Sequence, residues 1–199
     1  MVRRFDPSVP VPREVVRDLV ALAVRAPSAG FSQGWDFVAL LDAEDRAAFW
    51  DATDQGRPAD AWLRGVTAAP ALVLCLSDAD AYLDRYAEPD KGWTDRSPER
   101  WPIPYWDTDT AMAAMVLLLA AEDAGLGALF FGVPGDRHDA VREAHGIPAG
   151  RRVVGVVALG KPAATAARVG GSPRTRGRRP LDEVLHEGRF GGGWPGASG

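Results

Sequence analysis

Residues 106–133, WDTDTAMAAMVLLLAAEDAGLGALFFGV, decide the fold of this chain. Their centre, residues 111–121, is eleven apolar residues without a polar interruption. A helix that is apolar on every side must be covered on every side. At 1.5 Å per residue a helix over residues 110–124 spans about 22 Å, which is short of the ~30 Å of a bilayer core. We therefore expect protein to bury it, either within its own domain or against a second copy of the chain.

The ends of this helix carry the expected signals. Asp107, Thr108 and Asp109 are N-cap candidates, and acidic side chains suit the positive end of the helix dipole. Gly125 and Gly127 are typical of a helix end. The apolar residues 128–131 directly after them predict a buried core strand.

Composition bounds the class of protein. The chain has 199 residues, 46% of them hydrophobic and 25% charged, which predicts a single domain over residues 1–199. A net charge of −4 argues against a general nucleic-acid binder. Residues 161–180 nevertheless hold six basic side chains and no acid, so the C-terminal extension 161–199 is basic at its start and favours a local anion site.

The lone Cys75 excludes an internal disulfide and favours a reducing cytoplasm. No signal peptide or membrane span is visible, so we expect a cytoplasmic protein without a membrane partner.

The remaining elements predict an α+β sandwich, since strands and helices alternate too rarely for a doubly wound sheet. An extended arm covers residues 1–12. Expected helices are 13–25, 44–53, 136–145 and a brief one at 181–185, and expected strands are 37–41, 71–76 and 153–159.

Residues 82–105 form a long aromatic segment with four prolines and no helical or strand period. Loops this long in compact domains are usually functional. We interpret the segment as a lid over a flat apolar ligand. The segment holds the aromatic residues Tyr82, Tyr86, Trp93, Trp101 and Tyr105, and we assign the lid to Trp93, Trp101, Tyr105 and the adjacent Trp106. The alternative is a structural excursion that its own aromatic side chains hold in place.

The sequence lacks the usual catalytic motifs. No G-x-G-x-x-G follows a strand, no lysine-bearing phosphate loop exists, and no serine nucleophile elbow occurs. The three histidines are scattered and predict no metal site. We therefore nominate no catalytic side chain, and expect a bound cofactor to supply the chemistry if the protein is an enzyme.

Three features together predict a site for a phosphorylated, flat molecule. Arg3 and Arg4 stand at one end of the chain and residues 174–179 are arginine-rich at the other, as a divided phosphate site requires. The Ser/Gly-rich loop 28–34 and residues 130–132 can each bring backbone N–H groups against a ligand.

These residues resemble the FMN-dependent nitroreductase family. The opening RRFDPSVPVPREVVRDLVALAVRAPSAGFSQGWDFVAL is similar to the family's R-x-F arm, helix and APS-x-x-x-x-Q-x-W loop. DTDTAMAAMVLLLAAEDAGLGALFFG resembles its core helix, and VVGVVALGKP with RTRGRRPLDEVLHEGRF resembles its last strand and basic closing segment. The resemblance covers nearly the whole chain in the right order.

The resemblance implies a nitroreductase-type α-β sandwich with a mixed, mostly antiparallel sheet, an intertwined homodimer, and two FMN molecules at the dimer interface. Its cofactor-binding residues fall into four groups. The arm that binds the phosphate and ribityl chain is matched by Arg3 and Arg4, and the closing phosphate grip by Arg176 and Arg178. The loop that reaches the flavin from the other subunit is matched by Pro27, Ser28 and Ala29. The segment beside the flavin is matched by Phe130, Phe131 and Gly132, with the backbone of Phe131 and Gly132 near flavin N5. Arg174 with Arg176 is an alternative register of the closing phosphate grip.

The chain departs from the family pattern in three places. The family usually has another arginine before the arm, so either the true start lies upstream of Met1 or the phosphate grip is weaker. Phe31 replaces the usual asparagine of the loop, which exchanges a polar contact for an aromatic wall, and Gly34 replaces the usual proline. The segment 130–132 lacks the acidic residue of some members.

The resemblance implies an oxidoreductase that passes electrons from NAD(P)H through FMN to a flat acceptor, such as a nitroaromatic, quinone or flavin-like molecule, by a ping-pong mechanism. Alternatives are a specialised flavin oxidase or dehydrogenase, for instance on an azoline ring, a catalytically idle flavin-binding module, and an anion-binding protein without flavin. The sequence does not decide between NADH and NADPH, nor name the physiological acceptor.

Overall fold

The computed structural model describes residues 1–164 and 176–193 of the chain. The chain divides into two compact units, Met1–Ala167 and Arg168–Gly199, each of which is described by itself. The second unit contains the short helix η5 (Leu181–Glu183), within the range predicted for a brief helix. The single domain over residues 1–199 stays a prediction.

The first unit is built on a four-stranded antiparallel sheet in the order β1-β2-β4-β3. Its strands are β1 (Trp35–Leu40), β2 (Ala71–Asp78), β3 (Gly127–Phe131) and β4 (Arg151–Gly160). β2 and β4 are the central pair, and their near-continuous apolar sequences are buried on both faces. The predicted α+β sandwich is confirmed.

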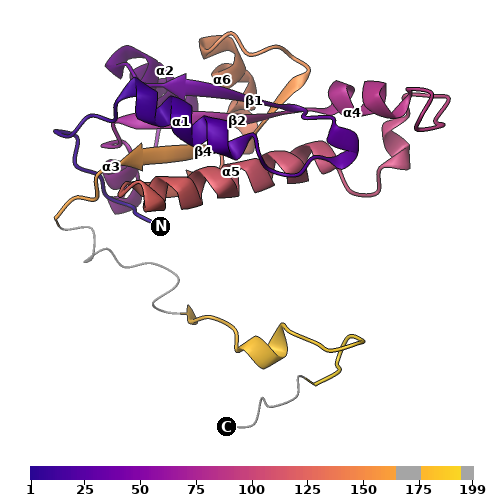
Figure 1. The fold of residues 1–199 in the computed structure, drawn as a ribbon. Helices are drawn as coiled ribbons and strands as arrows, with labels where there is room; N and C mark the ends of the chain where they lie inside the picture. Colours follow the sequence, from indigo (N-terminus) through magenta and orange to yellow (C-terminus); the bar gives the residue numbers. More distant parts are fainter. Residues whose placement is uncertain (165–175, 194–199) are drawn as a thin grey trace. The chain divides into compact units, whose positions relative to one another are not determined.

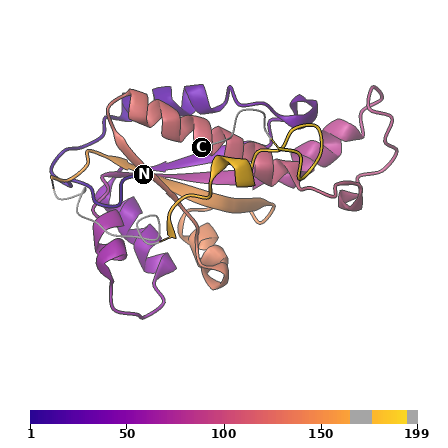
Figure 2. The same cartoon turned by 90° about the horizontal axis from the view of Figure 1, so that it is seen from below.

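Side chains of the central strands alternate between two apolar cores. Leu72 and Leu74 of β2 belong to the core on one face of the sheet. Val73 and Cys75 belong to the core on the opposite face. Figure 2 shows the sheet with α1 (Arg13–Ala23) and α5 (Tyr105–Asp123) on one side and the other helices of the core on the opposite side. Those helices are α2 (Ala43–Thr53), α3 (Ala61–Val66) and α6 (His138–Ala144).

The central helix α5 begins earlier than the sequence indicates. It starts at Tyr105 after Pro104, so the predicted N-cap candidates Asp107, Thr108 and Asp109 lie inside its first two turns. The prediction of its end is confirmed: Gly125 has a φ of +75°, and the Leu126 N–H donates to the Ala121 carbonyl over 2.8 Å, as in a Schellman motif.

A single chain covers α5 on one side only. Ala113, Leu117 and Ala121 are buried against the sheet and α1, whereas Met112, Met115 and Leu119 are 39%, 51% and 57% exposed. The helix is therefore apolar all round, as the sequence indicates, but one of its faces lacks a cover within this chain. None of the helices that the structure describes has the length and hydropathy needed to cross a membrane.

Two helices were not anticipated. α3 is absent from the sequence prediction, and α4 (Ala79–Tyr86) occupies the start of the segment 82–105, for which no helical period was predicted. Both are short helices with side-chain N-caps: Asp60 accepts from the Leu63 N–H over 2.7 Å, and Asp78 accepts from the Asp80 N–H over 3.0 Å. Figure 1 shows α4 at one end of the sheet.

The remaining helical turns are η1 (Ala29–Phe31), η2 (Pro98–Arg100) and η3 (Gly135–Arg137). The predicted helices 13–25 and 44–53 and strands 71–76 and 153–159 are confirmed with ends shifted by at most two residues.

Candidate functional site

The N-terminal arm lies against the edge of the sheet. The Val2 N–H donates to the Ala128 carbonyl of β3 over 2.9 Å, and the Asp6 N–H donates to the Lys161 carbonyl over 2.9 Å. Between them, Phe5 forms an isolated antiparallel bridge with Pro162 and is buried. These bonds hold the arm beside β3 and the end of β4.

The same contacts fix Arg3 and Arg4. A Cβ atom on Gly65 of α3 would lie only 2.2 Å from the Arg3 carbonyl oxygen, so the absence of a side chain at Gly65 is what lets the arm approach α3. Both arginines are half-buried, and within the described part of the chain neither has a carboxylate at ion-pair distance. Arginine side chains without a carboxylate at this distance are available to bind a phosphate.

The predicted segment 130–132 lies at the end of β3. Phe130 points toward the α5 side, where its ring lies over Gly155 of β4. Phe131 points to the other side and stacks on Trp50, with ring centroids 5.7 Å apart and planes 11° from parallel. Gly132 is exposed, and a Cβ there would meet no atom within 4 Å. A flat molecule can therefore approach the backbone at this position.

A cleft of about 440 Å³ opens beside Phe131 and Gly132. Its volume lies within the range of small-molecule sites. The aromatic side chains of Trp50 and Trp62 line it together with Phe131, and its rim includes Asp54 and Arg57. No sequence pattern indicates this cleft, because it lies between α2, α3 and the end of β3, and α3 is too short to show a helical period.

The loop after α1 contains the predicted Pro27, Ser28 and Ala29, and it is held from inside the protein. The Ala29 N–H donates to Oδ2 of Asp109 over 2.8 Å, and the Tyr82 hydroxyl donates to the same oxygen over 2.7 Å. Ser28 Oγ lies 3.3 Å from the Tyr82 hydroxyl and accepts from the Gln33 N–H over 2.7 Å. Asp109 is only 1% exposed.

Asp109 and Tyr82 were not identified as site residues from the sequence. The sequence places Asp109 among the N-cap candidates, and its partners Ala29 and Tyr82 are too distant along the chain for a local pattern to reveal them. Burial raises the pKa of the Tyr82 hydroxyl well above its usual range, so the phenol keeps its proton and donates to the carboxylate. Burial likewise raises the pKa of the Cys75 thiol to about 12, which makes it an unreactive thiol near neutral pH.

Within one chain, the arm and the loop lie far apart. Val2 lines a groove with Leu119 and Glu122, near the C-terminal end of α5, whereas the loop contacts Asp109 near its N-terminal end. The helix rise places Asp109 and Glu122 about 20 Å apart. The structure therefore brings Arg3 and Arg4 next to β3, but does not bring the loop 27–33 to them.

The four residues predicted as a lid belong to one aromatic cluster. Trp101 stands at its centre, with ring centroids 5.3 Å from Trp93, 5.6 Å from Tyr105 and 6.0 Å from Trp106. The cluster also includes Tyr82 and Tyr86, and none of its members lines the cleft beside Phe131. Their role as a lid stays a prediction.

The predicted closing phosphate grip lies in the second unit. Arg176 and Arg178 are both exposed there, and Arg174 lies outside the described residues. Their contact with a phosphate stays a prediction. Across the described ranges, no group of three His, Cys, Asp or Glu side chains is arranged to hold a metal ion.

Comparison with known proteins decides the family. The model of the nitroreductase family matches residues 1–161. The chain belongs to the nitroreductase family. It is 31% identical over 151 residues to a protein of Archaeoglobus fulgidus that carries the provisional name NADH dehydrogenase/NAD(P)H nitroreductase, an alignment that covers 75% of this chain and 73% of that protein.

Solved structures of nitroreductase-family and related proteins share the fold. A nitroreductase family protein from Streptococcus pneumoniae is 20% identical with a TM-score of 0.69, and the match covers 94% of each chain. A crystal structure described as an oxidoreductase containing FMN is 26% identical with a TM-score of 0.69, over 96% of this chain and 88% of that one. As a nitroreductase-family member, this chain is an oxidoreductase by class.

Proposed function

We propose that this protein is an FMN-dependent oxidoreductase that passes electrons from NAD(P)H to a flat organic acceptor in a ping-pong cycle, and that it works as a homodimer. The observation that carries the proposal is the arm: two arginines that have no carboxylate partner among the described residues lie beside β3, the strand directly before the open backbone of Gly132. The names of the Archaeoglobus protein and of the FMN-containing structure support the donor and the cofactor.

The residues present fit FMN. Its phosphate requires cationic, multidentate donors, which Arg3 and Arg4 supply, and we assign Arg176 and Arg178 to the same task. Its flat ring requires a surface that no side chain obstructs, and the position of Gly132 is open. When bound, the flavin supplies reversible hydride acceptance and transfer. The backbone of Phe131 and Gly132 would hold the edge of the ring by N–H donation, and no side-chain proton donor is needed.

The exposed face of α5 supports the dimer. The arm lies near Leu119, the loop 27–33 lies near Asp109, and the exposed Met115 stands about midway between them. A two-fold axis near Met115 that pairs two α5 helices antiparallel would bring the loop of one copy to the arm of the other. Each of the two resulting sites would then combine an arm, a β3 end and a partner's loop.

The rest of the proposal concerns access. In the ping-pong cycle donor and acceptor use one site in turn, and the aromatic cluster of Trp93, Trp101, Tyr105 and Trp106 would exclude water from it. We propose the cytoplasm as its compartment because the sequence holds a single cysteine and so no internal disulfide, as is usual for proteins of a reducing compartment.

An absorption spectrum of the purified protein tests the proposal. We expect a flavin spectrum after FMN is supplied in excess, bleaching on anaerobic addition of NADPH or NADH, and return of the colour when a quinone or nitroaromatic is added. A protein that stays colourless overturns it. Bound FMN that neither nucleotide reduces supports an idle flavin-binding module, and oxygen-dependent turnover of a reduced substrate without NAD(P)H supports an oxidase.

The arm gives the first mutational prediction. Arg3→Ala and Arg4→Ala should each weaken FMN binding by about 10- to 100-fold, because a hydrogen bond to a charged group contributes about 1.5–3 kcal/mol. Titration of the apoprotein with FMN, followed by quenching of flavin fluorescence, measures this effect.

The matched control for the arm variants is Arg17→Ala. Arg17 has an 80% exposed side chain on α1, and within the described residues its side chain bonds only to the neighbouring Asp18. Its loss should leave FMN affinity unchanged. Equal effects at Arg17 and Arg3 would contradict a phosphate role for the arm.

A further inference from the structure

A buried carboxylate without a basic partner stands at the start of α5. Asp109 is 1% exposed, and within the described part of the chain no lysine, arginine or histidine lies at ion-pair distance from it. Its Oδ2 accepts from the Ala29 N–H and the Tyr82 hydroxyl, and its Oδ1 lies 3.5 Å from Thr108 Oγ1. A buried carboxylate is costly unless hydrogen bonds satisfy it, and the two short bonds to Asp109 come from the loop and from Tyr82 of α4. Asp109 therefore joins the loop to α4 and α5.

The loop that Asp109 holds has an unusual backbone. Gly30, Phe31 and Gln33 have φ angles of +62°, +57° and +51°, a region that residues with a side chain rarely adopt. Strained conformations of this kind persist where surrounding bonds determine them, and they gather at functional sites. Here the carboxylate fixes the residue directly before the left-handed turn.

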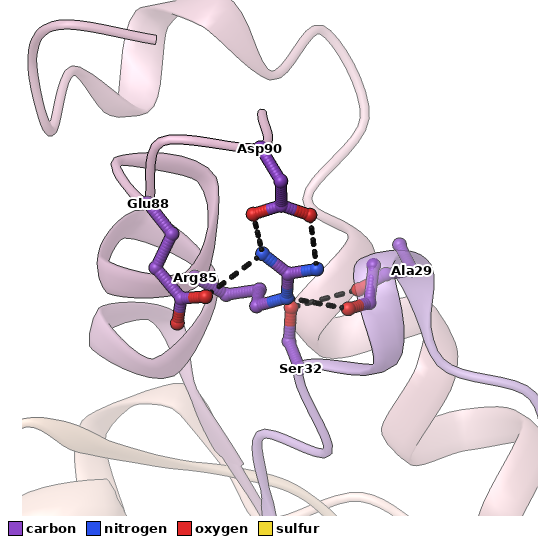
Figure 3. Close-up of polar contacts among 6 residues, drawn as sticks. Ala29, Ser32, Arg85, Glu88 and Asp90 are labelled. Atoms are coloured by element: carbon purple, nitrogen blue, oxygen red, sulfur yellow. Dashed lines mark hydrogen bonds and ion pairs between the residues drawn. The ribbon is translucent and has the colours of Figure 1, made fainter. Parts of the chain in front are cut away.

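A second set of bonds holds the loop from outside. Arg85 of α4 donates from Nε to the Gly30 carbonyl over 2.9 Å, while its other nitrogens pair with both carboxylate oxygens of Asp90 and with Glu88 (Figure 3). Ser32 Oγ donates to the Ala29 carbonyl over 2.7 Å. The loop is thus held at two backbone groups: its Ala29 N–H is bonded to α5, and its Gly30 carbonyl is bonded to α4.

In this left-handed conformation the loop exposes one large apolar side chain to solvent. Phe31 is 76% exposed, although its neighbours on either side are bonded to the protein. At this exposure the ring of Phe31 is free of the chain's own core and is available for contact with another molecule. The loop stands near the N-terminal end of α5, which the proposed antiparallel pairing places against the arm of a second copy.

We propose that Asp109 is a positioning residue that sets the conformation of the loop 28–33, and that the loop so held presents Phe31 as an apolar wall for a flat acceptor in the flavin site of a second copy. The second half of this inference rests on the proposed function. The first half is independent of it, since it concerns only bonds within one chain.

Amide hydrogen exchange of the wild-type chain and its variants tests the first half. Asp109→Leu removes the acceptor and keeps the branched shape of the side chain, so exchange across residues 29–33 should rise at least tenfold. Asp109→Asn can place its carbonyl oxygen at the position of Oδ2, so exchange should stay within about twofold of wild type, because the bonds need an acceptor and not a charge. Unchanged exchange in Asp109→Leu overturns the inference.

The chain offers a matched control and a milder variant. Asp107 lies two residues earlier on α5, where it accepts from Ser77 and pairs with Arg152 rather than with the loop, so Asp107→Asn should leave exchange in residues 29–33 at the wild-type rate. If Asp109→Leu does not fold, Tyr82→Phe carries the same test. It removes one of the two donors to Oδ2 and keeps the ring packed against Trp101 and Trp106.

A double-mutant cycle tests the second half with 1,4-naphthoquinone as the acceptor. Phe31→Ala should raise KM for the quinone about three- to tenfold with a smaller change in kcat. Asp109→Leu should do the same, and the double variant should be no worse than either alone, because Phe31 acts only when the loop is held. Multiplying effects on KM would mean that Asp109 acts through general stability and would overturn the inference.

Failure of the proposed function can be distinguished from failure of the positioning role of Asp109. If the wild-type protein binds no FMN, the proposed function fails and the wall at Phe31 fails with it. The exchange experiment then still decides whether Asp109 positions the loop.

Discussion

At the scale of single residues, the packing of Phe130 on the sheet gives a sharp test of the β3–β4 register. A Cβ on Gly155 would lie 2.1 Å from Cζ of the Phe130 ring. Gly155→Ala should therefore lower the free energy of unfolding by about 1–3 kcal/mol, the usual cost of overpacking. Urea unfolding measures it.

Two variants control for the loss of glycine flexibility at Gly155. Gly135→Ala should be nearly neutral, because no atom lies within 4 Å of the added Cβ. In a Phe130→Ala background, the cost of Gly155→Ala should largely disappear. If Gly155→Ala costs no more than Gly135→Ala, the ring does not lie where the structure has it.

Residue roles were predictable only where the signal is local. Ser28 and Ala29 stand in a stretch whose composition alone indicates a turn. The role of Asp109 depends on Tyr82, 27 positions earlier, and on Ala29, 80 positions earlier. No local pattern contains that information, so the sequence analysis placed Asp109 among the N-cap candidates of a helix that in fact begins at Tyr105.

At the scale of elements, the long and strongly patterned segments were predictable and the short ones were not. β2 and β4 are continuous apolar runs, and α1 has a clear apolar face, so periodicity identifies them. α3 has six residues, too few for a period, and its start depends on the Asp60 cap. The cleft beside Phe131 was missed for the same reason, since α3 forms one of its walls.

The cap of α3 gives a prediction at this scale. Asp60→Ala should lower the free energy of unfolding by about 1 kcal/mol, the usual cost of losing an N-cap acceptor. It should also weaken FMN binding modestly, because Gly65 of α3 packs against the arm. Thermal unfolding and FMN titration measure the two effects.

Two further variants isolate the cap. Asp60→Asn keeps an acceptor and should restore most of the stability. Asp45→Ala removes an acid from the first turn of α2, where no side-chain cap bond exists, and should cost only a few tenths of a kcal/mol. Equal costs at Asp45 and Asp60 would contradict the cap.

At the scale of the whole molecule, the sequence correctly indicates the family and the α+β sandwich, since three motifs occur in order along the chain. The candidate site is different, because its parts are not all neighbours in one chain. Strand pairing brings the arm to β3, but α5 separates the arm from the loop 27–33 by about 20 Å. Only the apolar exposed face of that helix indicates how the two parts could meet.

The dimer itself gives the last prediction. Leu119 is 57% exposed on α5, and in an antiparallel pairing each substitution enters the interface twice. Leu119→Glu should therefore convert a species of twice 21.3 kDa into a monomer at micromolar concentration, because it buries two unpaired carboxylates. Sedimentation velocity measures the mass.

The control variant is Ile103→Glu, at a 49% exposed apolar position outside α5, which should stay dimeric. FMN affinity should fall with the dimer in Leu119→Glu, because each proposed site needs a loop from the other copy. A wild-type monomer that binds FMN tightly would contradict both the interface and the shared site.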